Sequence, residues 1–471
     1  MNRSRATAAA LVIILSAFLS ACAVGPEYRR PTLSIAPQWY ATLPHGGDPG
    51  NLAQWWAQFD DPLPAELIAE AQRNNPGLNQ ALARIAQSRA GVIAARSTLF
   101  PTLSANTLAQ RSNSIALTTP QTLGQATLDA SWEIDLFGAN RRGREAAQAR
   151  YEGAQAQWHD ARVSLAAEVA QEYVGLRACE ALVKNLAEDL ASRRESERLT
   201  HLKVDAGFDA PADGALASAS AADAAGRVNA QRAECDISIK ALVALTGLPE
   251  PDLRNRLAAR TGILPTPASF TIVQLPAHTL MQRPDMAAAE RELAAASAEI
   301  GGAEAARYPS LTLTGSVGFQ TLRTGGITLD DKLWSFGPAL SLPIFDAGRR
   351  AANVDAAQAR YNEALANYTG RARQAVREVE QALVRLNSAS ARESDAQRAA
   401  EGYDKVFKAA EDRWRVGTGS LLELEDTRRT AVASCTQLLT VQRERIAAWI
   451  SLYRAAGGGW SPTDPVDPAK S

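Results

Sequence analysis

The apolar positions in this chain follow two different periods, which predict long helices separated by pairs of strands. Between residues 141 and 204 they recur every three or four residues, and a seven-residue seam runs through Val169, Leu176, Val183 and Leu190. Such a seam is typical of helices that pack lengthwise against neighbours. The stretch has no proline, and its 64 residues predict a helix about 95 Å long. A solvated two-helix hairpin without a channel is the alternative.

Other segments alternate between apolar and polar residues, which is the period of a β-strand. Apolar side chains take most second positions within 128–136, 311–319 and 336–344. Strands of about ten residues with one apolar and one polar face are typical of membrane barrels. A half-buried antiparallel sheet in a soluble protein is the alternative. Four strands cannot close a membrane barrel, since the smallest has eight, so several chains would have to share one.

The chain is internally duplicated. Residues 76–137 match residues 284–345 at an offset of 208, and after a two-residue slip the offset is 210 as far as Gly247 and Gly457. A period this long indicates a duplicated strand-and-helix module rather than a solenoid. The helices expected in the two copies are 62–97, 141–204 and 211–246, then 284–306, 347–414 and 420–455.

The N-terminus resembles a bacterial lipoprotein signal. Two arginines precede a short apolar stretch that ends in Leu19-Ser20-Ala21-Cys22, which predicts a signal peptide over 1–21. Cys22 is then the acylated first residue, carrying acyl and diacylglycerol groups and no other cofactor. Ala23 follows in place of aspartate, which by the resemblance to bacterial lipoproteins implies the outer membrane. A plain signal peptide with a chance cysteine is the alternative. No later apolar run reaches about 20 residues, so a spanning structure would have to be a barrel.

The remaining cysteines predict one disulfide. Cys179 lies 28 residues before Gly207 and Cys235 lies 28 after it, so a hairpin that turns at Gly207 places both at one height. An extracytoplasmic location permits oxidation. We therefore predict a Cys179–Cys235 disulfide and a free Cys435, with two small buried thiols as the alternative.

Composition excludes several classes of function. The 471 residues carry a net charge of −1, so a nucleic-acid partner is not expected. The four histidines are scattered, without metal-ligand spacing. Because phosphate loops and nucleophile motifs are also absent, no metal site and no enzymatic activity are expected.

Several motifs occur in order along this duplicated frame. They are Trp56-Ala57-Gln58-Phe59-Asp60-Asp61-Pro62, Asn75-Pro76-Gly77-Leu78, Ser131-Trp132-Glu133-Ile134-Asp135-Leu136-Phe137-Gly138 and Ser341-Leu342-Pro343-Ile344-Phe345-Asp346-Ala347-Gly348-Arg349-Arg350. With these motifs the chain resembles the outer-membrane factor family, the TolC-like exit ducts of tripartite efflux pumps, and specifically its lipoprotein branch.

The resemblance implies a mainly α fold with a membrane β-barrel. A homotrimer would contribute four strands per chain to a 12-stranded barrel, continuous with a long periplasmic α-helical barrel. It implies a lipid-anchored outer-membrane protein that passively conducts small toxic compounds with a periplasmic adaptor protein and an inner-membrane pump. The same duct in protein secretion and a non-channel lipid-anchored coiled-coil scaffold are the alternatives.

The expected organisation has six parts. They are the signal peptide (1–21), a lipid-anchored tether (22–60), repeat one (61–249), a connector (250–280), repeat two (281–459) and a C-terminal tail (460–471).

The resemblance also assigns roles at the two helix turns. The adaptor would dock at a tip formed by Gly207, Val416, Gly417 and Thr418. Leu422 and Asp426 match the family's hydrophobic and acidic gate rings, and such rings block a pore by dewetting and favour cations. Repeat one departs from the pattern, with Leu216 at the position of Asp426, although Asp213 could contribute to the tip. A solvated helix charge is the alternative for Asp426, because charged residues crowd it.

Overall fold

The computed structural model describes residues 24–33, 39–41, 52–113, 119–267, 280, 283–461, 464 and 466. Cys22, the expected signal peptide and most of the expected tail lie outside these residues. The chain divides into two compact units built from discontinuous segments. The first comprises Met1–Leu33, Leu82–Ala156 and Ala287–Gly370, and the second comprises Ser34–Ala81, Gln157–Met286 and Arg371–Ser471.

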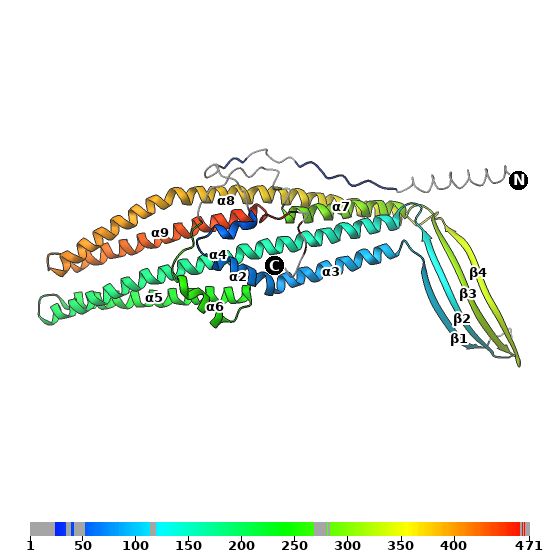
Figure 1. The fold of residues 1–471 in the computed structure, drawn as a ribbon, viewed down its shortest axis with the longest axis horizontal. Helices are drawn as coiled ribbons and strands as arrows, with labels where there is room; N and C mark the ends of the chain where they lie inside the picture. The colour runs from blue at the N-terminus through cyan, green and yellow to red at the C-terminus, as the bar shows by residue number, and fades with distance from the viewer. Residues whose placement is uncertain are drawn as a thin grey trace. The chain divides into compact units, whose positions relative to one another are not determined.

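The elements follow the duplicated order expected from the sequence (Figure 1). The first copy contains η1 (Leu52–Gln58), α2 (Leu63–Asn74), α3 (Pro76–Ser97), β1 (Thr102–Ser112), β2 (Gln121–Ile134), α4 (Ala139–Asp205) and α5 (Pro211–Thr246). The connector contains α6 (Glu250–Leu257) and η2 (Ala258–Arg260). The second copy contains α7 (Pro284–Ala305), β3 (Ser310–Thr324), β4 (Ile327–Ser341), α8 (Arg349–Arg415) and α9 (Leu421–Ala455).

Equivalent elements of the two copies have matching lengths. Helices α3 and α7 each have 22 residues, and α4 and α8 each have 67. Helices α5 and α9 have 36 and 35 residues. At 1.5 Å per residue α4 and α8 are each about 100 Å long, close to the length expected from the sequence. Among the described helices, none is both long and apolar enough to cross a membrane.

The single helix expected over 62–97 is wrong, because the chain breaks there into α2 and α3. Asn75 has an extended backbone, with φ −69° and ψ 122°, because the ring of a following proline disfavours the helical conformation. Its side-chain oxygen accepts a hydrogen bond from Gly77 N at 2.8 Å, which caps α3. Two further differences are that α6 lies within the expected connector and that β4 ends at Ser341, before the expected position 344.

The two-residue slip between the copies lies where the sheet meets the long helices. Gly138 and Gly348 are equivalent and share φ 86°, so Asp346 and Ala347 are the inserted pair. In copy one the Asp135 carboxylate accepts the N–H groups of residues 140 and 141 at 3.1 and 2.8 Å. In copy two Asp346 accepts those of residues 348 and 350 at 3.1 and 3.3 Å. Each long helix therefore keeps an acidic cap, although the two aspartates occupy different positions.

The four strands form one antiparallel sheet in the order β1-β2-β3-β4 (Figure 1). The register aligns Leu128 with Val317 and Val317 with Trp334 on one face. The side chain of Trp334 is 80% exposed in the chain, and that of Phe319 on the same face is 66% exposed. This sheet therefore presents an apolar face that no other part of the described chain covers.

The second unit contains a buried cluster around Arg177, whose side chain is fully buried. Its guanidinium donates to the Tyr173 hydroxyl and to the Glu180 carboxylate, both at 2.9 Å. Tyr173 in turn donates to Asp61, which accepts the first N–H of α2 at 3.0 Å. Glu180 also accepts the N–H of Gly262 at 2.8 Å. The cluster thus joins α4 to α2 and to the segment that follows η2.

Replacing Glu180 by alanine should destabilise this unit. The change leaves the buried Arg177 guanidinium without its carboxylate, which typically costs about 3–5 kcal/mol. We expect a lower thermal midpoint, followed by circular dichroism at 222 nm in detergent. Glu168→Ala removes an exposed glutamate from the same helix and should leave the midpoint unchanged. Equal midpoints for the two variants would contradict a structural role for the cluster.

Candidate functional site at the hairpin turns

Two helical hairpins, α4–α5 and α8–α9, end in turns of the same design. Gly207 and Gly417 have φ of 75° and 79°, a conformation that strains any residue with a Cβ. In the first turn Phe208 N donates to Lys203 O at 2.8 Å, and in the second Thr418 N donates to Arg413 O at 2.9 Å. These bonds satisfy carbonyls at the helix ends, so each glycine is required by the geometry of its turn.

The turns expose apolar side chains to solvent. Phe208 and Val416 are largely exposed, and the Thr418 hydroxyl donates back to Arg413 O at 3.1 Å. Figure 1 shows each turn at the free end of its hairpin. The structure thus places the expected docking residues Gly207, Val416, Gly417 and Thr418 at accessible tips.

The two expected gate residues of copy two lie one turn apart on α9. Leu422 is 72% exposed, and the exposed Asp426 pairs with Arg429 three residues later. Asp213 of copy one lies in the first turn of α5, where its carboxylate accepts the N–H of Ala210 at 3.3 Å. The structure thus places Leu422 and Asp426 on the exposed side of α9 and Asp213 at the start of α5.

An ion network between the hairpins was missed by reasoning from the sequence. Arg193 of α4 pairs with Asp189 at 2.9 Å and with Glu425 of α9. Arg428 is 1% exposed and donates to the hydroxyl groups of Ser192 and Ser196 at 3.0 and 2.8 Å. Burial lowers the pKa of Arg428. The network fastens α9 to α4 next to Leu422 and Asp426.

One signal in the sequence could have revealed this network. The repeat positions equivalent to Asp189, Arg193, Glu425 and Arg428 are Ala399, Tyr403, Ala215 and Ser218. Charged residues that replace neutral ones at equivalent positions of a duplication indicate a contact made in one copy only. Not all of the charged residues near Asp426 surround it in solvent. Glu425 and Arg428 point away from it and bond to residues of α4.

The structure joins Cys179 of α4 to Cys235 of α5 by a disulfide, with 5.6 Å between their Cα atoms. Cys435 is a free, half-buried thiol, and burial raises its pKa. Within the described part of the chain, no group of three or more His, Cys, Asp or Glu side chains could hold a metal ion.

The comparison with known proteins identifies the family. Residues 67–248 and 275–458 match the family described as outer membrane efflux protein. The chain belongs to this family. Outer membrane protein OprJ of Pseudomonas aeruginosa is 30% identical over 96% of this chain and 95% of its own. The expected resemblance is thereby confirmed at the level of the family.

Solved structures agree with the fold described above. The outer-membrane channel OprN superposes with a TM-score of 0.81 at 29% identity, covering 93% of this chain and all of that one. The MtrE outer membrane channel of Neisseria gonorrhoeae, solved in an open state, gives 0.78 at 28% identity, covering 93% and 98%. The mainly α fold with a small antiparallel sheet is therefore that of an outer-membrane efflux channel, which extends into the periplasm.

Non-reducing peptide mapping should recover residues 179 and 235 in one cross-linked peptide. The reason is the 5.6 Å separation of their Cα atoms, which lies within the range that a disulfide bridges. Iodoacetamide added to the unfolded, unreduced protein should label Cys435 alone among these three cysteines. Labelling of Cys179 and Cys235 before reduction would show two thiols instead. Cys435→Ser serves as the control that removes only the labelled site.

Proposed function

We propose that three copies of this chain assemble into one continuous duct through which small toxic compounds leave the cell passively. The observation that carries this proposal is the open sheet. Strands β1 and β4 each have one neighbour, and edge strands carry unpaired N–H and C=O groups. Inside a membrane those groups must find partners. A 12-stranded barrel made from three sheets supplies them.

The two faces of the sheet fit the wall of such a barrel. Leu128, Val317 and Trp334 share one face, while Asp129 lies on the other and accepts hydrogen bonds from the side chains of Asn106 and Thr127 at 2.7 and 2.9 Å. In membrane barrels the apolar face meets lipid and the polar face lines the interior. The polar face therefore becomes a water-filled passage that needs no catalytic step.

The helical hairpins would continue this passage through the periplasm. Their exposed turns at Gly207 and Gly417 are the surfaces that we assign to a periplasmic adaptor protein, which links the duct to an inner-membrane pump. Three copies of Leu422 and Asp426 would meet around the axis at the periplasmic end. Leucine rings close a pore by dewetting, and carboxylate rings favour cations. Transport energy would come from the inner-membrane partner.

The N-terminal segment supports acylation at Cys22. The N–H of Val24 donates to Phe137 O at 3.2 Å, at the junction between β2 and α4. Gly25 packs on Gly301 so closely that an added Cβ would lie 2.3 Å from its Cα. Cys22 is two residues before Val24 in the sequence. A lipid carried just ahead of Val24 would enter the membrane beside the sheet.

Replacing Asp426 by alanine should raise single-channel conductance in planar bilayers and weaken the preference for cations. A unit charge acts on an ion about 4 Å away with about 1 kcal/mol in water, so we expect the cation preference to fall on the order of fivefold. Reversal potentials in mixed salts measure this ratio.

The matched control for this experiment is Asp395→Ala. Asp395 is also exposed and also pairs with an arginine three residues later, but it lies on α8, away from the gate. It should leave conductance and selectivity unchanged. A protein that never conducts, even as the Leu422→Ala and Asp426→Ala double variant, would instead be the coiled-coil scaffold.

Cys22→Ser should abolish incorporation of labelled palmitate, because the thiol is the acylation site. The variant should also keep its signal peptide, which mass spectrometry of the intact protein detects. Cys435→Ser changes a cysteine far along the chain and should incorporate palmitate normally. Labelling that persists in Cys22→Ser would reject the lipid anchor.

A further inference from the structure

The charged residues of the sheet are sorted by sign between its two faces. The described strands contain three basic residues, Arg111, Arg323 and Lys332. All three lie on the apolar face, because the register places Arg111 and Arg323 on either side of Thr122, and Lys332 opposite Phe319. Of the four acidic residues, only Asp330 lies on that face; the others, on the opposite face, are Asp129, Glu133 and Asp331.

The basic residues also occupy one end of the apolar face. They lie toward the β1–β2 and β3–β4 connections, whereas the strand ends next to the helices carry Ile134, Leu311 and Leu340 in one row. From Leu311 to Phe319 strand β3 rises about 27 Å along its axis. This is enough, after the tilt of a barrel strand, for most of the apolar band of a membrane barrel. The basic residues therefore lie at the outer edge of the hydrocarbon layer.

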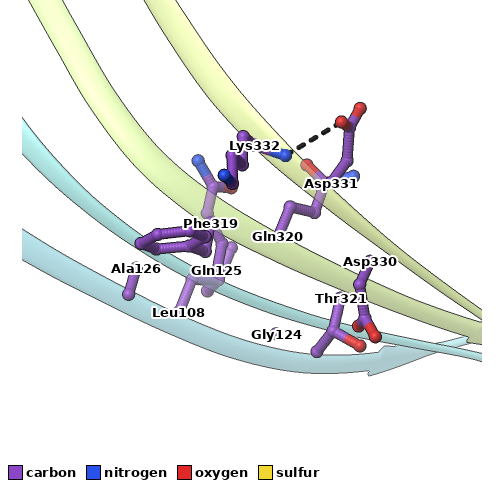
Figure 2. Close-up of a pocket in the computed structure, with 10 residues that line it drawn as sticks. All are labelled: Leu108, Gly124, Gln125, Ala126, Phe319, Gln320, Thr321, Asp330, Asp331 and Lys332. Carbon is purple, nitrogen blue, oxygen red and sulfur yellow. Dashed lines mark hydrogen bonds between the residues drawn. The ribbon is translucent and has the colours of Figure 1, made fainter.

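A hollow in the sheet lies at the same level (Figure 2). Its lining includes Phe319 and Lys332 from adjacent strands, Ala126 of β2, and the acidic Asp330 and Asp331 of β4. A second hollow extends along the strands past Trp334. Phe319 and Trp334 are both strongly exposed. The surface thus combines an apolar channel with three basic side chains and one carboxylate, that of Asp330, at its outer end.

We propose that this surface binds the phosphorylated, acylated glycolipid of the outer leaflet of the outer membrane. Arg111 and Arg323 are two strand spacings apart, about 10 Å, so their long side chains can converge on a phosphate above the Thr122 hydroxyl. Arginine is suited to phosphate because its planar donors form paired charge-assisted bonds. Lys332 lies nearer the hydrocarbon layer than the two arginines do and binds a second phosphate. The acyl chains pack against Phe319 and Trp334.

Simple snorkelling of long basic side chains is the competing explanation. It would not separate acids from bases across the sheet. In the described strands all three basic residues but only one of the four acidic residues lie on the apolar face. The proposal rests on the barrel of the proposed function, in which the apolar face meets lipid.

Binding of purified diphosphoryl lipid A to the detergent-solubilised protein tests the proposal. The variant Arg111→Gln/Arg323→Gln/Lys332→Gln should bind lipid A at least about tenfold more weakly, because the charge-assisted bonds to its phosphates are lost. The control Arg84→Gln/Arg89→Gln/Arg96→Gln removes three exposed charges from α3 and should bind as the natural protein does. Native mass spectrometry measures both.

Two further measurements identify the ligand. Lipid A stripped of its phosphates should bind as weakly as the triple variant does, and millimolar inorganic phosphate should not displace the intact lipid. Arg323→Gln alone is measured as well, in case the triple variant assembles poorly, and it should weaken binding severalfold. Unchanged binding in the single variant, or equal binding of phosphate-free lipid, would overturn the site.

The lipid site and the duct can be rejected independently of each other. Binding is measured on the solubilised chain and needs no open pore. A protein that conducts but binds lipid A independently of Arg111, Arg323 and Lys332 rejects the lipid site and keeps the duct. A protein that binds lipid A through these residues but never conducts supports the lipid site and rejects the duct.

Discussion

The pairing of backbone groups at the edges of the sheet is the constraint on which the rest of this structure depends. Strands β1 and β4 each leave one edge without a partner among the described residues of the chain. In water such an edge invites aggregation, and in hydrocarbon its unpaired groups cost several kcal/mol each. The chain can therefore complete its sheet in the outer membrane only by pairing with other strands. Assembly of several chains and insertion into the membrane are therefore coupled in this fold.

Duplication supplies the strands that this sheet needs. One module contains two strands and one helical hairpin, and its second copy doubles both. The inserted pair Asp346-Ala347 lies between strand and helix, where it leaves both intact: α4 and α8 keep 67 residues each. Ala347 adopts a φ of 54°, which is strained for a residue with a Cβ. Asp346 offsets this strain by accepting backbone N–H groups of the next helix.

Period and turn chemistry in the sequence were enough to locate most elements, since these depend on neighbouring residues. Helix α5 has the expected bounds, and the turns at Gly207 and Gly417 require glycine locally. Contacts between segments far apart in the sequence could not be predicted from these local signals. The alternation that continues to Ile344 predicted a longer β4, but the strand ends at Ser341 because its partner β3 begins at Ser310. Arg193 and Glu425 meet across a separation of 232 residues.

Contacts between distant residues also explain how two copies of one backbone acquire different roles. Buried ion networks contribute little net stability, and their best-attested effect is to fix the register of packed helices. The network of Arg193, Glu425 and Arg428 sets α9 against α4 at one height. The equivalent contact between α5 and α8 has only Ala215, Ser218, Ala399 and Tyr403 available, so it cannot form the same lock. A few side chains, rather than the shared backbone, therefore distinguish the interface between α4 and α9 from its counterpart between α5 and α8.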